Sequence, residues 1–163
     1  MIDVAELADW SRALPAPEET ARRAAASALA VGMAPAGAIV SLALADDETL
    51  RRLNREHRGM DRPTNVLAFP DGGRAGPEAG AALLLGDVVV ALETATAEAA
   101  RDGRPVADHL SHLVVHGVLH LLGYDHDDDR MAEEMEALER RALEALGIGD
   151  PYAPVPGAEE GVG

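Results

Sequence analysis

The sequence of 163 residues contains no cysteine and few aromatic residues, which make up only 2% of the chain. Without cysteine the chain forms neither disulfides nor thiolate metal sites, which fits a reducing cytosol and leaves histidine as the soft metal ligand. The scarcity of aromatic rings leaves almost no side chains on which nucleobases could stack. The chain also lacks an apolar run of the roughly 20 residues that a membrane span requires, and its acidic start lacks the pattern of a signal peptide. We therefore expect a cytoplasmic protein with no membrane partner.

Lysine is absent as well, so the 14 basic residues are all arginine, and with 29 acidic residues the formal net charge is −15. Proteins that bind nucleic acids usually present a basic surface, so the total charge argues against such a partner. The arginines are unevenly distributed, however, because five of them crowd one short stretch: Arg51, Arg52, Arg55, Arg58 and Arg62. This cluster is compatible with a solvated helix face, but a local basic patch can also hold a phosphate group bidentately.

The length suits one domain that is large enough to bury a core. Apolar periodicity, caps and helix breakers predict helices at residues 18–31, 47–57, 93–101, 105–122 and 130–146. Short apolar runs predict strands at residues 38–45, 64–69 and 83–91. Because helices and strands do not alternate strictly, we predict a single α+β domain with a small mixed β-sheet packed against helices.

The N-terminal and C-terminal segments are predicted to have different structures. Residues up to Pro17 mix charged residues with Trp10 and two prolines, and we expect them to cover an edge of the fold. The domain is predicted to span residues 1–147. Residues 148–163 are rich in proline, glycine and glutamate, so we expect them to form a flexible tail.

The most informative stretch carries three histidines and reads His116-Gly-Val-Leu-His120-Leu-Leu-Gly123-Tyr-Asp-His126. On a helix, His116 and His120 lie one turn apart on the same face, where two imidazoles can bind one metal ion. Gly123 can adopt the left-handed backbone conformation that ends helices, after which the chain can present His126 as a third nitrogen ligand. This spacing is that of the long zincin motif. We therefore predict a metal site on His116, His120 and His126.

Three neutral ligands leave a coordination position for water, which is the arrangement of catalytic rather than structural zinc. Such a metal lowers the pKa of bound water to about 7 and polarises a carbonyl or phosphoryl oxygen. Gly117 stands where a zinc peptidase carries its glutamate base. The ligand spacing therefore favours a metallopeptidase, while the missing glutamate opposes it. His109 and His112 lie on the same helix without a glycine turn in register, and we expect them to be polar-face residues or neighbours of the ligands.

The histidine motif resembles the signature of the YbeY family of bacterial metal-dependent endoribonucleases. Two further stretches, residues 53–70 and 85–90, resemble the other motifs of that family and follow in the same order. The resemblance covers roughly residues 1–147 and leaves the tail outside.

This resemblance implies a zincin-like fold with one zinc ion per chain, or another divalent transition metal, on the three histidines. It also implies cleavage of single-stranded RNA, not DNA, in the maturation of the 3′ end of 16S ribosomal RNA and in ribosome quality control. The ribosome or small-subunit proteins would then be partners. Arg58 matches a functionally important arginine of the family. We predict Arg58 and His116 as catalytic residues, and Arg55, Arg58 and Arg62 as residues that bind the substrate.

The sequence is compatible with alternatives for the nucleophile and for the class of protein. The nucleophile is either metal-bound hydroxide or the 2′-hydroxyl of the RNA itself. The protein could also be a non-catalytic ribosome-assembly factor with a structural metal, a class that the acidic charge and the few aromatic residues favour.

Overall fold

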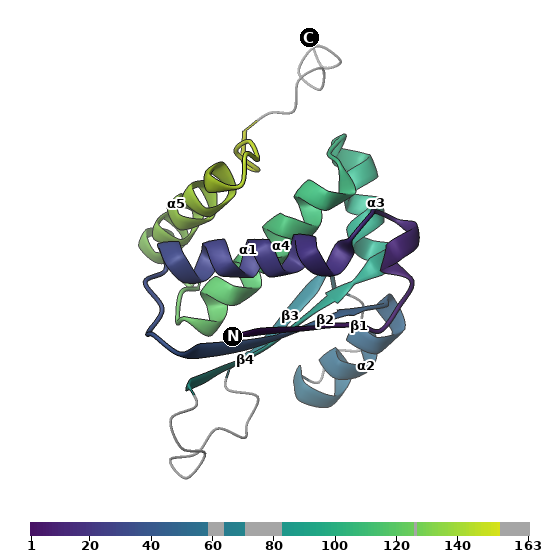
Figure 1. Cartoon of the computed structure of the whole chain (residues 1–163), viewed down its shortest axis with the longest axis horizontal. Helices are drawn as coiled ribbons and strands as arrows, with labels where there is room; N and C mark the ends of the chain where they lie inside the picture. The colour runs from purple at the N-terminus through teal and green to yellow at the C-terminus, as the bar shows by residue number, and fades with distance from the viewer. Residues whose placement is uncertain (59–63, 71–82, 126, 154–163) are drawn as a thin grey trace.

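The structure, a computed structural model, describes residues 1–58, 64–70, 83–125 and 127–153 (Figure 1). In chain order, its helices and strands are β1 (Ile2–Glu6), the 3₁₀ turn η1 (Trp10–Arg12), α1 (Pro17–Val31), β2 (Ala38–Ala45), α2 (Asp47–Arg58), β3 (Val66–Pro70), β4 (Leu83–Ala91), α3 (Leu92–Asp102), α4 (Val106–Leu121) and α5 (Asp129–Ala145). The predicted α+β class is confirmed.

The described strands form one mixed sheet in the order β1-β2-β4-β3. Strands β1, β2 and β4 run parallel, while β3 lies antiparallel to β4 at one edge. No strand was predicted in the N-terminal segment, but the segment forms β1, which pairs with β2 from Ile2 opposite Val40 onward. Every second residue of this edge strand is exposed, so its apolar signal is weak.

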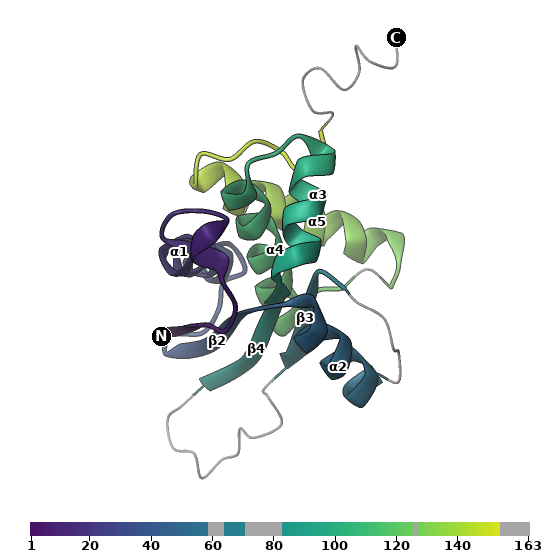
Figure 2. The ribbon, with the colours of Figure 1, turned by 90° about the vertical axis from the view of Figure 1, so that its right-hand side faces the viewer.

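The two faces of the sheet are covered by different helices (Figures 1 and 2). Helices α1 and α4 cover one face, and α5 packs on these two helices farther from the sheet. Helix α2 covers the other face through a small separate cluster that includes Leu50, Leu67 and Val89. Alternation along β3 directs Leu67 to α2 and Ala68 to the α4 side. Strand β3 therefore lies between the helix with the arginines and the helix with the histidines.

Helix α4 is the central element of the larger core. It follows Pro105 and buries ten of its residues, among them Leu110, Val114 and Val118. Gly123, just beyond its end, has a φ of 101°, as the sequence predicted for a glycine that ends the helix. Among the described residues, no helix is both long and apolar enough to cross a membrane.

Candidate metal centre

Helix α4 presents four histidines along one face, because they are spaced by three, four and four residues: His109, His112, His116 and His120. The last two approach each other most closely. Their ring centroids are 4.6 Å apart, and 3.1 Å separates Nε2 of His116 from Nε2 of His120. The helix thus brings together two of the three predicted ligands.

This nitrogen pair suits a shared metal ion. Two vertices of a tetrahedron with zinc–nitrogen distances of about 2.05 Å are separated by roughly 3.3 Å, close to the 3.1 Å between Nε2 of His116 and Nε2 of His120. His126, the third predicted ligand, lies outside the described residues. The described residues alone contain no group of three side chains that could hold a metal ion.

The two histidines line a cleft of about 470 Å³ between α4 and the edge strand β3. Its described lining residues are Thr64, Asn65, Val66, Ala68, Pro70, His116, Gly117 and His120. None of these is a carboxylate, so the described wall of the cleft offers no aspartate or glutamate as a general base.

Gly117 explains why the peptidase glutamate is missing from the motif. A Cβ atom built on Gly117 would lie 2.6 Å from Cγ1 of Val88 on β4. Val88 is fully buried and β-branched, so it has little freedom to move away. Helix α4 approaches the sheet too closely at this point for any side chain, and a glutamate here would require the packing to change.

Glu139 of α5 is a site residue that the sequence analysis missed. Its side chain is 0% exposed, and its Oε2 lies 2.7 Å from Nδ1 of His116. Its other oxygen, Oε1, lies 2.9 Å from Nε2 of His112 and accepts a hydrogen bond from the hydroxyl of Tyr152. The spacing of Glu139 from the buried Met135 and Ala142 could have revealed a carboxylate on the inner face of α5.

The surroundings of Glu139 determine its ionisation. Burial disfavours the charged form and by itself would raise the pKa of this carboxyl group. The hydrogen bonds from His112 and His116, the charge of His116 and the bond from Tyr152 outweigh burial and lower the pKa to about 2. Burial and the contact with this carboxylate raise the pKa of the Tyr152 phenol. At neutral pH Glu139 is therefore an ionised acceptor and Tyr152 a protonated donor.

Tyr152 belongs to the segment after α5, which was expected to be a flexible tail. Nη2 of Arg104 donates to the carbonyl oxygen of Pro151 at 2.9 Å. Nε of Arg140 lies 3.1 Å from Oδ2 of Asp150, and its guanidinium carbon lies 5.4 Å from the Tyr152 ring centroid. The described part of this segment, residues 148–153, thus packs against the domain, while residues 154–163 lie outside the described chain.

A second carboxylate, that of Glu98, contacts His109, the histidine at the N-terminal end of the row. Nε2 of His109 lies 2.8 Å from Oε1 of Glu98 on α3. The amide nitrogen of Asn65 donates to the same oxygen at 3.0 Å. Glu98 thereby links the edge of the cleft to α4.

Of the three arginines predicted to bind the substrate, Arg55 has a described side chain. It is exposed on α2, a helix that covers the face of the sheet opposite to α4 (Figure 2). Arg58 ends α2, and both its side chain and the whole of Arg62 lie outside the described part of the chain. Near the end of α2, the ring of His57 lies 5.0 Å from that of Phe69 on β3, the strand whose alternate residues line the cleft.

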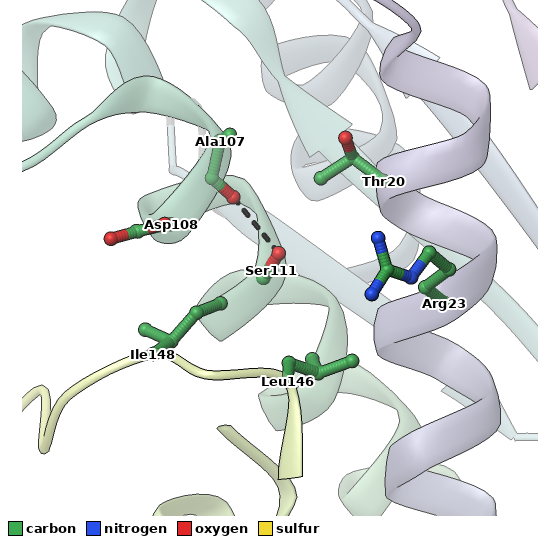
Figure 3. A pocket seen from close by; sticks show the side chains of 7 residues that line it. All are labelled: Thr20, Arg23, Ala107, Asp108, Ser111, Leu146 and Ile148. Carbon is green, nitrogen blue, oxygen red and sulfur yellow. Dashed lines mark hydrogen bonds between the residues drawn. The ribbon is translucent and has the colours of Figure 1, made fainter. Parts of the chain in front are cut away.

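A smaller pocket of about 160 Å³ lies between α1, α4 and the chain after α5 (Figure 3). Arg23 points into it opposite Ser111, whose hydroxyl donates to the carbonyl oxygen of Ala107 at 2.9 Å. No residue predicted for the site lines this pocket.

Comparisons with known proteins agree with the motifs. The family described as "Endoribonuclease YbeY" matches residues 9–147. A protein of that name from Paramagnetospirillum magneticum is 56% identical over 146 residues, which cover 88% of this chain and 89% of the relative. Another from Azorhizobium caulinodans is 52% identical over 154 residues, which cover 93% of this chain and 96% of the relative.

A solved structure supports the fold. The solution structure of a Thermotoga maritima protein matches with a TM-score of 0.52 and 23% identity, and the match covers 94% of this chain and 99% of that one. At this identity the likeness concerns the fold alone. The family match and the close relatives together confirm the prediction made from the motifs: the chain belongs to the endoribonuclease YbeY family.

Proposed function

We propose that this protein is a metal-dependent endoribonuclease that cleaves single-stranded RNA. The relatives are named endoribonuclease, and one structural observation gives the main support for the proposal in this chain. It is the pair of imidazole nitrogens, 3.1 Å apart, on the wall of a cleft of about 470 Å³. Its cellular role is the maturation of the 3′ end of 16S ribosomal RNA and ribosome quality control, in the cytoplasm.

The metal would be held by His116, His120 and His126, and zinc is the ion that best suits three imidazoles. When bound, such an ion supplies a Lewis acid for a phosphoryl oxygen and lowers the pKa of water. His116 contributes to catalysis by holding the ion through Nε2, the nitrogen that faces His120. Gly117 lies between these two ligands in sequence and lets α4 pack closely on Val88 of β4, which fixes the helix that carries them.

The substrate is a polyanion, and the chain carries a net charge of −15. Binding therefore depends on a few local cations. Arg58 would hold a non-bridging oxygen of the scissile or neighbouring phosphate and stabilise the charge that develops there. Arg55 and Arg62 would contact phosphates farther along the strand. Because three arginines are few for binding a polyanion, the ribosome or a small-subunit protein would deliver the RNA.

Cleavage of a labelled oligonucleotide tests the proposal. A 5′-labelled single-stranded RNA is incubated with wild-type protein of known zinc content, with His120→Ala, and with His109→Gln as a control histidine on the same helix. The expected result is cleavage by the wild type, none by His120→Ala, and none of a DNA of the same sequence. Failure of zinc-loaded wild-type protein to cut any RNA would contradict the proposal.

The products of the same experiment identify the nucleophile. Attack by the 2′-hydroxyl leaves a 2′,3′-cyclic phosphate on the upstream fragment. Attack by water leaves the phosphate on either fragment without a cyclic intermediate. No carboxylate is among the described residues that line the cleft, so the product ends, and not the described lining, distinguish the two routes.

A further inference from the structure

We propose that Glu139 is a positioning residue of the metal centre, which orients His116 and is itself held in place by His112 and by Tyr152 of the C-terminal segment 148–153. The inference rests on the proposed metal site and adds residues to it that lie on α5 and beyond. Glu139 does not reach the cleft and acts only through His116.

The contact with His116 decides which ring nitrogen is available to a metal. A carboxylate only accepts hydrogen bonds, so Nδ1 of His116, 2.7 Å from Oε2, must carry a hydrogen. In the neutral ring this leaves the lone pair on Nε2. Nε2 is the atom that faces His120 across 3.1 Å. Glu139 therefore selects the tautomer, and the ring orientation, that a metal ligand at this position requires.

The carboxylate is held by more than one contact. Nε2 of His112 lies 2.9 Å from Oε1, and the Tyr152 hydroxyl donates to the same oxygen. Both oxygens are thus engaged in a side chain that is 0% exposed. A buried charge persists only when such partners compensate it. The same partners leave the carboxylate little freedom to rotate, which fixes the direction of Oε2 towards His116.

One of these partners comes from the end of the described chain. The cation–π contact between Arg140 and Tyr152, the Arg140–Asp150 pair and the bond from Arg104 to Pro151 hold the segment against the domain. The segment thereby contributes a hydroxyl to the support of a residue in the metal centre. Its role extends beyond covering α5.

A metal titration tests the inference without reference to activity. Metal-free protein is titrated with Co²⁺, and the visible absorption of the ion reports the dissociation constant and the ligand geometry. Glu139→Gln keeps the size of the side chain but offers one acceptor oxygen in place of two, so it cannot accept from both His116 and His112. We expect Glu139→Gln to bind Co²⁺ about 10- to 100-fold more weakly than the wild type.

The chain provides a matched control in Glu98→Gln, which changes the carboxylate beside His109 on the same helix. This variant is expected to bind Co²⁺ as the wild type does. Equal weakening in both variants would indicate a general loosening of α4 and would overturn the proposal, as would wild-type affinity in Glu139→Gln. Absence of Co²⁺ binding by the wild type itself would instead contradict the proposed metal site, so the two failures are distinguishable.

Two further measurements keep the test decisive if Glu139→Gln does not fold. Tyr152→Phe removes a single hydroxyl from a side chain that is 42% exposed, and we expect it to weaken Co²⁺ binding severalfold; unchanged affinity in this folded variant would overturn the proposal. Nitrogen-15 shifts of the histidine rings in metal-free wild type should show His116 with its hydrogen on Nδ1. A hydrogen on Nε2 would contradict the assignment.

Discussion

A Cβ atom on Gly117 of α4 would lie 2.6 Å from Cγ1 of Val88 on β4, so the histidine helix and the sheet are in close contact at this glycine. We predict that Gly117→Ala destabilises the protein by about 1–3 kcal/mol through overpacking, reduced by at most about 1 kcal/mol through the higher helix propensity of alanine. Urea unfolding of the two proteins measures the difference.

A compensating substitution provides the control for this prediction. Val88→Ala removes the atoms that the new methyl group would meet, so the double variant should be less destabilised than the sum of the two single variants. Strict additivity of the two free-energy changes would show that the contact with Val88 is not the reason why position 117 requires glycine.

We predict that Asn65→Asp also destabilises the domain. The Asn65 amide nitrogen donates to Oε1 of Glu98 at 3.0 Å, and an aspartate there would replace a hydrogen bond by the approach of two carboxylates. The expected loss is about 1–3 kcal/mol at pH 7. Thermal or urea unfolding measures it, and the double variant Asn65→Asp, Glu98→Gln should recover most of the loss. If the double variant were less stable still, the Asn65–Glu98 contact would not be the cause.

The local part of the site could be predicted from the sequence, because it depends on one helix. Four-residue spacing alone places His116 beside His120, and Gly123 ends the helix where the motif requires it. Glu139 reaches His116 from 23 residues away. That contact depends on how α5 packs on α4, which no periodicity in either helix specifies. Tyr152 was assigned to a tail because prolines and glycines dominate the composition around it.

The sheet shows the same division between local and long-range information. Strands β2, β3 and β4 are apolar enough to be recognised within their own sequence. Strand β1 was missed because it alternates half-buried and exposed residues over only five positions. Its pairing with β2 also joins residues almost 40 positions apart, such as Ile2 and Val40. Likewise, the arginine cluster is evident in the sequence, but the position of α2, which carries Arg51, Arg52 and Arg55, on the sheet face opposite the histidine helix is a property of the fold.

The low pKa of Glu139 predicts a pH dependence of stability in the metal-free protein. In the folded state this carboxyl group has a pKa of about 2, against an ordinary value of 4.5. Its stabilising contribution is therefore complete above pH 4.5 and is lost as the pH falls towards 2, with a total on the order of 3 kcal/mol. Urea unfolding of the wild type and of Glu139→Gln between pH 6 and pH 2, in the presence of a chelator, should show a stability difference that shrinks over this window. A constant difference would contradict the prediction.

We predict that Arg58→Ala lowers kcat for RNA cleavage by about 100-fold, the loss typical of removing one donor to a developing negative charge, and leaves the metal content unchanged. Steady-state cleavage and metal analysis of the purified variant measure the two quantities. Arg22→Ala, which removes an exposed arginine on α1, serves as the matched control. Loss of metal in Arg58→Ala would show that Arg58 supports the metal centre and that we have misassigned its role.

Reconstitution of the metal-free protein with zinc tests the central claim most directly. Wild-type protein stripped by a chelator is titrated with zinc, and cleavage of single-stranded RNA is measured at each step. We predict that activity is absent at the start, rises linearly and reaches a plateau at about one zinc ion per chain, and that His120→Ala shows no rise. Full RNA cleavage by the metal-free protein, or a plateau with no cleavage in the fully loaded wild type, would contradict a metal-dependent endoribonuclease.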